Sequence, residues 1–362
     1  MKVIYFSWAL LVTISFILLG QAFRLQVIQG KEQDLRAEQN RFRIRSLEAP
    51  RGNFHDRNGT QLTVNEADMR SYPFGEELAH VLGYVGEANE EELMLFGVDM
   101  GRVVGKMGLE RDQNALLQGV EGGVVEEFSA AGEKVRTFSK KEPIPGRNIQ
   151  LTLDQKLQHA AYEALKEGSY RGAVLAGTVD GKILAMAIHP SFDSNAFSKL
   201  ILEEGDLETE AYVSSLFENK SKPMFNRAIS GLYPPASTFK IVTSIAALEQ
   251  GTITSETQIE DTGQISAGGS IFGNWYYSQY GATDGMVNVA KALQRSNDIF
   301  FYKVGGEVGI DKIAEWARVF GLGSPTGIAL AGEEKGLVPD KQWKQEVLGE
   351  DWYLGDTYIT SI

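Results

Sequence analysis

The stretch Tyr233-Pro234-Pro235-Ala236-Ser237-Thr238-Phe239-Lys240, followed by the apolar residues 241–248, decides the fold and the chemistry of this chain. Prolines suit the chain just before a helix or its first turn, so they predict a buried helix that begins near Ser237. Residues three apart on a helix share a face, which directs the Lys240 ammonium toward the Ser237 hydroxyl. Apolar surroundings would lower the pKa of Lys240, so that its neutral amine accepts the serine proton.

Short patterns of this kind have structural alternatives. Ser-x-x-Lys occurs once in the chain, and a serine N-cap with a snorkelling lysine would give the same letters. A second polar group, Ser296-Asn297-Asp298, precedes the aromatic residues 300–302. There Ser296 is placed to relay a proton to a leaving group and Asp298 to order the site. The alternative for this group is ordinary turn chemistry.

Composition excludes several classes of function. The chain has 362 residues, enough for two or three domains. Acidic residues outnumber basic ones 48 to 35, and the net charge of −13 argues against nucleic-acid binding. The absence of cysteine excludes disulfides and thiolate metal ligands, and no two of the four histidines have the spacing of a metal pair. We therefore expect no metal and no cofactor.

Residues 3–23 carry no charge and are long enough to span a bilayer as a helix. Lys2 precedes this stretch and Arg24 follows it. We expect an uncleaved single-pass anchor in the cell membrane with the bulk of the chain extracytoplasmic. The alternative is a signal peptide cleaved after Gly20-Gln21-Ala22, which would also export the chain.

The rest of the sequence predicts an α+β fold. Residues 24–147 are β-rich, with a strand pair expected over residues 124–138. Asp154 is expected to cap a helix over residues 155–166. Two apolar strands, residues 173–178 and 182–188, are joined across Asp180-Gly181 as a hairpin. We expect an antiparallel sheet with helices packed on it.

Residues 233–240 resemble the active-site motif of class B penicillin-binding proteins, the D,D-transpeptidases that cross-link peptidoglycan. Ser296 and Asp298 are similar to the first and third positions of the second motif in the penicillin-binding protein 2 group, which serves cell elongation. Further stretches resemble family motifs in the expected order: Ala49-Pro50-Arg51-Gly52 through Asp56-Arg57-Asn58-Gly59, His80-Val81-Leu82-Gly83-Tyr84-Val85-Gly86, Gly108-Leu109-Glu110, Leu151-Thr152-Leu153-Asp154, Gly181-Lys182-Ile183-Leu184-Ala185-Met186, Pro190-Ser191-Phe192-Asp193 and Trp352-Tyr353-Leu354-Gly355-Asp356-Thr357.

The resemblance implies three parts: a transmembrane anchor (residues 1–23), a pedestal domain (24–147) and a transpeptidase domain of the serine β-lactamase type (148–362). It implies that Ser237 attacks a D-alanyl-D-alanine stem peptide and that Lys240 is the general base. Penicillins would acylate the same serine, and a membrane glycosyltransferase would be a partner.

Three departures from the family pattern are visible. No Lys-Thr-Gly or Lys-Ser-Gly triplet occurs, so we expect that the sequence is truncated before the third motif and that the transpeptidase domain is incomplete. Only a short polar stretch separates Asn65 from His80, where the group usually carries a larger head subdomain that contacts partners. Ala236 stands where the family usually has glycine.

Two other functions stay open from the sequence. One is a hydrolytic relative, a β-lactamase or D,D-carboxypeptidase, although the Glu-x-x-Leu-Asn pattern of a class A β-lactamase is absent. The other is a non-catalytic scaffold or sensor that lacks the third motif. Turnover of a β-lactam would separate the first from a transpeptidase, and the coding sequence after Ile362 would test the second.

Overall fold

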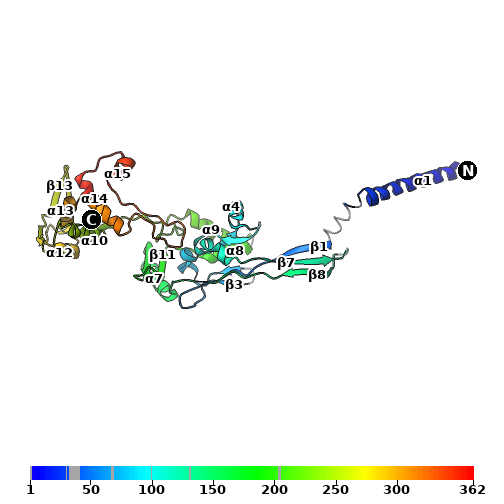
Figure 1. The fold of residues 1–362 in the computed structure, drawn as a ribbon, viewed down its shortest axis with the longest axis horizontal. Coiled ribbons are helices and arrows are strands. Elements are labelled where there is room, and N and C mark those ends of the chain that lie inside the picture. Colours follow the sequence, from blue (N-terminus) through cyan, green and yellow to red (C-terminus); the bar gives the residue numbers. More distant parts are fainter. Residues whose placement is uncertain are drawn as a thin grey trace. The chain divides into compact units, whose positions relative to one another are not determined.

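A computed structural model describes residues 2–29, 31, 41–66, 69–98, 100–129, 132–202 and 205–362. The chain divides into two compact units, Met1–Met224 and Phe225–Ile362, which are described one at a time (Figure 1).

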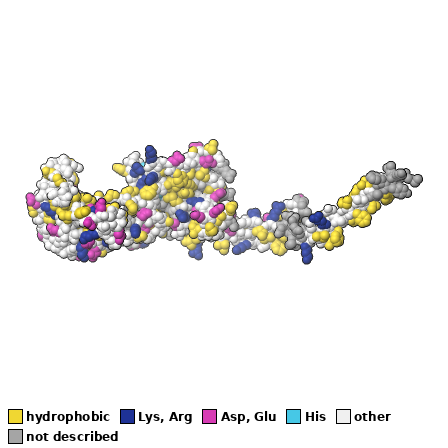
Figure 2. Space-filling model, turned by 90° about the horizontal axis from the view of Figure 1, so that it is seen from above, with side chains coloured by type: hydrophobic (Ala, Val, Ile, Leu, Met, Phe, Trp, Pro, Cys, Tyr) yellow, Lys and Arg dark blue, Asp and Glu magenta, His cyan; other side chains and the backbone are white. Residues whose placement is uncertain are grey.

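The first unit begins with helix α1 (Lys2–Phe23), which continues into one π-helical turn, η1 (Arg24–Ile28). The segment Leu10–Ile28 is long and apolar enough to cross a membrane, and none of it is buried. Hydrophobic side chains cover this segment in Figure 2. The predicted N-terminal helix is therefore confirmed, and its exposed apolar surface has no protein layer to cover it among the described residues.

The pedestal is built from small sheets. Its largest is antiparallel, in the order β1-β7-β8, with β1 (Phe42–Leu47), β7 (Gly122–Phe128) and β8 (Lys134–Lys141). The strand pair predicted over residues 124–138 is thus confirmed, whereas Ala131 at its turn lies outside the described residues. Shorter pairs are β2 (Phe54–His55) with β9 (Ile149–Gln150), β3 (Val64–Glu66) with β4 (Met69–Ser71), and β5 (Val85–Glu87) with β6 (Val103–Gly105). The short helices are η2 (Gly75–Glu77), α3 (Ala79–Leu82), α4 (Glu90–Phe96), α5 (Gly108–Asp112) and α6 (Asn114–Leu117).

A buried ionic cluster holds the pedestal together. Glu110 is fully buried and lies 2.7 Å from both Arg51 Nε and Arg70 Nε. Arg51 also donates to Asn114 Oδ1 at 2.9 Å. Removing a charge from water is costly unless it is paired and hydrogen-bonded, and two guanidinium groups meet that need here. Arg51 and Glu110 belong to two of the stretches that resemble family motifs, so one cluster accounts physically for both.

A helix and a hairpin follow the pedestal within the same unit. Asp154 accepts hydrogen bonds from the backbone of Lys156 and Leu157 and so caps α7 (Gln155–Glu167), as predicted. Strands β10 (Gly172–Gly177) and β11 (Ile183–His189) pair antiparallel across the predicted turn. Helix α7 packs on β11. The unit ends with α8 (Ser194–Leu202) and α9 (Leu207–Glu218).

The second unit is mainly helical and contains two buried apolar clusters. Its helices are η3 (Ala236–Thr238), α10 (Lys240–Glu249), α11 (Trp275–Tyr280), α12 (Val289–Arg295), α13 (Asp298–Val308), α14 (Ile310–Val319), α15 (Lys341–Trp343), η4 (Lys344–Leu348) and α16 (Leu354–Thr360). Its strands form two antiparallel pairs, β12 (Ile259–Glu260) with β15 (Met286–Val287) and β13 (Gln264–Ala267) with β14 (Ser270–Gly273). Phe300, Phe301 and Val304 of α13 are fully buried against Ala246 and Ala247 of α10. This packing brings the start of α10 beside the start of α13.

Candidate active site

Ser237 lies on the surface where the chain turns into α10. It is the middle residue of η3, and Pro235 occupies the N-cap position, so the predicted helix start is confirmed. Ala236 just before it has a φ of +50°. An L-residue in this left-handed region costs about 1 kcal/mol, whereas glycine adopts it without strain. The structure thus gives a physical reason for the glycine that the family resemblance leads us to expect at this position.

Lys240 is the first residue of α10 and its side chain is only 1% exposed. Its Nζ donates to Asp298 Oδ1 at 2.6 Å and to the Ser296 carbonyl oxygen at 2.9 Å. Burial lowers the pKa of Lys240, and the hydrogen bond and charge of Asp298 raise it; burial prevails, so the pKa lies below its usual value. The amine therefore loses its proton more readily than an exposed lysine would.

Ser296 connects Ser237 to Lys240. Its Oγ donates a hydrogen bond to Ser237 Oγ at 2.8 Å, and Lys240 Nζ donates to the same Ser296 Oγ at 3.1 Å. The sequence directs the Lys240 ammonium toward the Ser237 hydroxyl, and between these two described residues the path runs through Ser296. The ammonium group turns instead to the Asp298 carboxylate, because a charge-assisted hydrogen bond is stronger than one to a hydroxyl.

Asp298 is the first residue of α13 and faces two partners. Its Oδ1 accepts from Lys240, and its Oδ2 accepts from the Trp275 backbone amide at 3.1 Å. Helix α13 itself was not predicted, because the sequence of its polar start is equally typical of a turn. Asn297 caps this helix by accepting from the Phe300 amide at 2.9 Å. The polar trio is therefore a helix start as well as part of the site.

The four predicted residues, Ser237, Lys240, Ser296 and Asp298, are brought together by the structure. Sequence reasoning missed the residues that support them: Asp261, Asn274, Trp275 and Asp284. Their side chains or amides bond to the second motif from positions 13 to 36 residues earlier in the chain, and no local pattern marks them.

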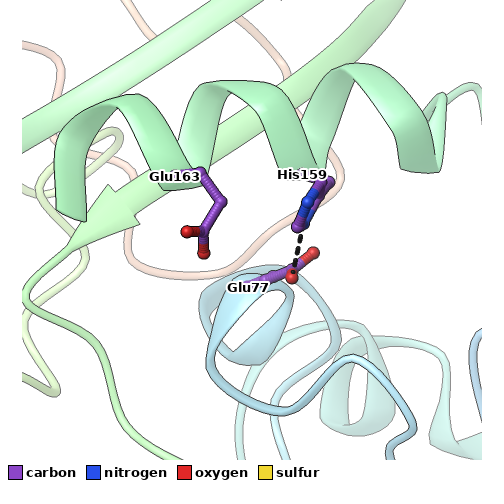
Figure 3. A group of neighbouring side chains, drawn as sticks. All are labelled: Glu77, His159 and Glu163. Carbon is purple, nitrogen blue, oxygen red and sulfur yellow. Dashed lines mark hydrogen bonds and ion pairs between the residues drawn. The ribbon is translucent and has the colours of Figure 1, made fainter. Parts of the chain in front are cut away.

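A second group of titratable side chains lies in the other unit. Glu163 and His159 extend from α7 toward Glu77 of η2 (Figure 3), and one oxygen of each glutamate lies within 4.8 Å of a ring nitrogen of His159. His159 Nδ1 is 2.8 Å from Glu77 Oε1, and this hydrogen bond, with the charges of Glu77 and Glu163, raises the pKa of His159. The imidazole is 55% exposed. These donor types would suit a zinc ion, but the bond between His159 and Glu77 already explains their approach.

Two protein families match this chain, one in each half. Residues 172–358 match the family described as the penicillin binding protein transpeptidase domain, and residues 64–151 match the penicillin-binding protein dimerisation domain. The chain therefore belongs to the penicillin-binding protein transpeptidase family, and the resemblance drawn from its motifs is confirmed.

Individual relatives point to one branch of that family. The peptidoglycan D,D-transpeptidase MrdA of Salmonella typhimurium is 37% identical over 309 residues, covering 83% of this chain and 48% of that protein. The chain thus spans about half the length of the curated relatives it matches. The structure of a complex between PBP2 and MreC from Helicobacter pylori matches with a TM-score of 0.78 and 27% identity, covering 89% of this chain and 73% of that one. A structure of a peptidoglycan synthase complex that coordinates polymerization and crosslinking matches with a TM-score of 0.76 and 29% identity, covering 99% and 74%.

Proposed function

We propose that this chain carries the acylation site of a peptidoglycan D,D-transpeptidase that acts in cell elongation. The observation that supports this most is the hydrogen-bonded chain from Ser237 through Ser296 to a buried lysine. It supplies a nucleophile, a relay and a base in contact. Names of relatives in the same family agree with the chemistry.

The first half of the reaction forms an ester on Ser237. The serine oxygen attacks the carbonyl carbon of the penultimate D-alanine of a stem peptide. Because hydroxyl protons can rotate, the Ser237 proton passes to Ser296 Oγ while the Ser296 proton passes to the neutral amine of Lys240. The tetrahedral intermediate then collapses, the peptide bond breaks, and the terminal D-alanine leaves as an amine after it takes up a proton by the reverse path.

The second half transfers the acyl group. An amine of a neighbouring stem peptide attacks the ester carbonyl and loses a proton to the same Ser296–Lys240 path. Ser237 leaves with that proton, and a new peptide bond joins the two strands. Asp298 holds the Lys240 amine in place during both halves. A β-lactam acylates Ser237 by the first half of this sequence and stops there.

We further propose that the chain is anchored by α1 with its bulk outside the cytoplasm, and that it works beside a membrane glycosyltransferase. The apolar, uncovered segment Leu10–Ile28 supports the anchor. The related synthase complex, which couples polymerization to crosslinking, supports the partner. An MreC-like protein is a second candidate partner, on the likeness to the Helicobacter pylori complex. The predicted domain boundaries, 24–147 and 148–362, belong to the same proposal.

Fluorescent penicillin tests the acylation site. Protein expressed from its complete coding sequence should be labelled covalently in membranes, and Ser237→Ala should abolish the label because it removes the oxygen on which the ester forms. Ser255→Ala, at an exposed serine of the same unit, is the matched control and should label normally. Wild-type protein that folds and remains unlabelled would contradict the proposal and favour a non-catalytic scaffold.

A further inference from the structure

Asp261 is a buried carboxylate that the chemistry above does not use. It follows β12 and is only 3% exposed. Its Oδ1 accepts from the Gly263 amide at 2.8 Å. Its Oδ2 accepts from Asn274 Nδ2 at 2.8 Å, from the Asp284 amide at 2.9 Å and from Asn297 Nδ2 at 2.9 Å. Four donors therefore converge on one side chain.

The Gly263 amide lies two residues along the chain from Asp261. The other three donors come from separate segments, and two of these segments lead directly to the site. Asn297 stands between Ser296 and Asp298 in the chain. Asn274 precedes Trp275, whose amide binds Asp298 Oδ2, and Asn274 Oδ1 accepts from the Asp298 amide at 3.3 Å. A displacement of Asp261 would therefore reach Ser296 through Asn297, and Asp298 through Asn274.

The loop that carries Ser296 needs such support. Ser296 has a φ of +51°, in the left-handed region that a serine adopts at a cost of about 1 kcal/mol. It ends α12 and the chain turns at once into α13. Asn297 fixes this turn from both ends: its Oδ1 caps α13, and its Nδ2 is shared between Asp261 Oδ2 and Asp284 Oδ2, the latter at 3.0 Å.

A cation lies beside the carboxylate that shares Asn297 with Asp261. Asp284 is a second carboxylate on Asn297, and Arg295 Nε donates to Asp284 Oδ1 at 2.9 Å. Burial by itself would raise the pKa of Asp284, but hydrogen bonds from Asn297 and Arg295 lower it, so this carboxyl stays ionised. The amide of Asn297 is thus held between two acceptors, which leaves it one orientation.

We propose that Asp261 is the positioning residue of this site: through Asn297 and Asn274 its carboxylate holds Ser296 and Asp298 where Lys240 reaches both. The inference rests on the proposed acylation chemistry. Asp261 acts only through other residues and does not touch the reacting atoms. A shift of about 1 Å at Ser296 would break the path from Ser237 to Lys240, and misplacement of that size can cost about 100-fold in rate.

Asp261→Asn tests this role with little change in shape. In either orientation its amide nitrogen faces a donor, because Oδ1 and Oδ2 both accept hydrogen bonds in the native protein. We expect acylation by a fluorescent penicillin to slow about 10- to 100-fold in its rate constant, while the dissociation constant of the reversible complex changes far less. The fraction of protein that finally becomes labelled should stay close to that of wild type. A protein that had merely lost stability would show the opposite: a smaller labelled fraction that reacts at the normal rate.

A second variant covers the case in which Asp261→Asn does not fold. Asn297→Ser removes both Nδ2 hydrogen bonds but keeps an oxygen that can cap α13. It should slow acylation in the same way. In combination with Asp261→Asn it should add little, because both changes disrupt the same contact between Asp261 and Asn297. Asp311→Asn, at a carboxylate 67% exposed, is the matched control and should acylate normally.

The outcomes separate the two proposals. If Asp261→Asn or Asn297→Ser folds and acylates at the wild-type rate, Asp261 has no positioning role, although the acylation site stands. If wild-type protein is not labelled at all, the acylation site itself fails. Slow labelling of a full complement of sites in the variants, with normal labelling of Asp311→Asn, supports the positioning role.

Discussion

The two compact units each bury a cluster of charges, and the clusters differ in the cation they use. In the pedestal, Glu110 is clamped by Arg51 and Arg70. In the second unit, Asp298 is paired with Lys240 at 2.6 Å. Both clusters are largely buried and carry short, charge-assisted hydrogen bonds. Arginine keeps its proton in any protein environment, whereas a buried lysine can lose its proton. The first cluster is therefore a fixed clamp and the second can take part in proton transfer.

Replacing Lys240 with arginine should have the largest effect, because arginine cannot give up its proton. Lys240→Arg keeps the positive charge beside Asp298 but removes the proposed acceptor of the proton from Ser237 and Ser296. We expect acylation by fluorescent penicillin to fall by about 10²- to 10⁴-fold, the usual contribution of a general base. Lys312→Arg, at an exposed lysine paired with Glu315, is the control and should be neutral. Near-normal acylation by Lys240→Arg would show that Lys240 is not the base.

Neutralising the pedestal carboxylate should affect stability and leave the chemistry alone. Glu110→Gln leaves two buried guanidinium groups without a counter-charge, and removing one partner of a buried pair costs about 3–5 kcal/mol. Denaturant unfolding should show this loss in the free energy of unfolding. Glu142→Gln, at an exposed pair with Lys140, should change it by less than about 1 kcal/mol. A stable Glu110→Gln protein would mean that the arginines are solvated by other groups.

The exposed pair of His159 and Glu77 gives the smallest expected effect and a defined pH dependence. The pKa of His159 is raised above its ordinary 6.5 by the hydrogen bond and charge of Glu77. A raised pKa in the folded state stabilises the fold fully below about pH 6.5, and the contribution disappears as the pH rises through the folded value. His159→Gln should therefore lower the free energy of unfolding in acid and match wild type in alkaline buffer. Glu77→Gln should remove the same difference, and a loss that is equal at all pH values would contradict this account.

The sequence predicted correctly those helix starts and turns that depend on a few neighbouring residues. The cap at Asp154, the turn between β10 and β11 and the start of α10 each depend on residues within a few positions of one another, and all three are confirmed. Helix α13 was missed because its polar start resembles a turn and its aromatic residues show no amphipathic period. The sequence directed the Lys240 ammonium toward Ser237, but it could not show that a carboxylate 58 residues away would bind the same ammonium group.

By itself the sequence determined the family, the nucleophile and base candidates and the membrane-length helix, because each is written in residue type and short spacing. Only the tertiary structure decided how those residues connect. Ser296 lies between Ser237 and Lys240, and Asp261 ties the second motif to segments well before it in the chain. Hydrogen bonds between distant segments depend on how helices pack, and packing is set by the whole core rather than by any one stretch of letters.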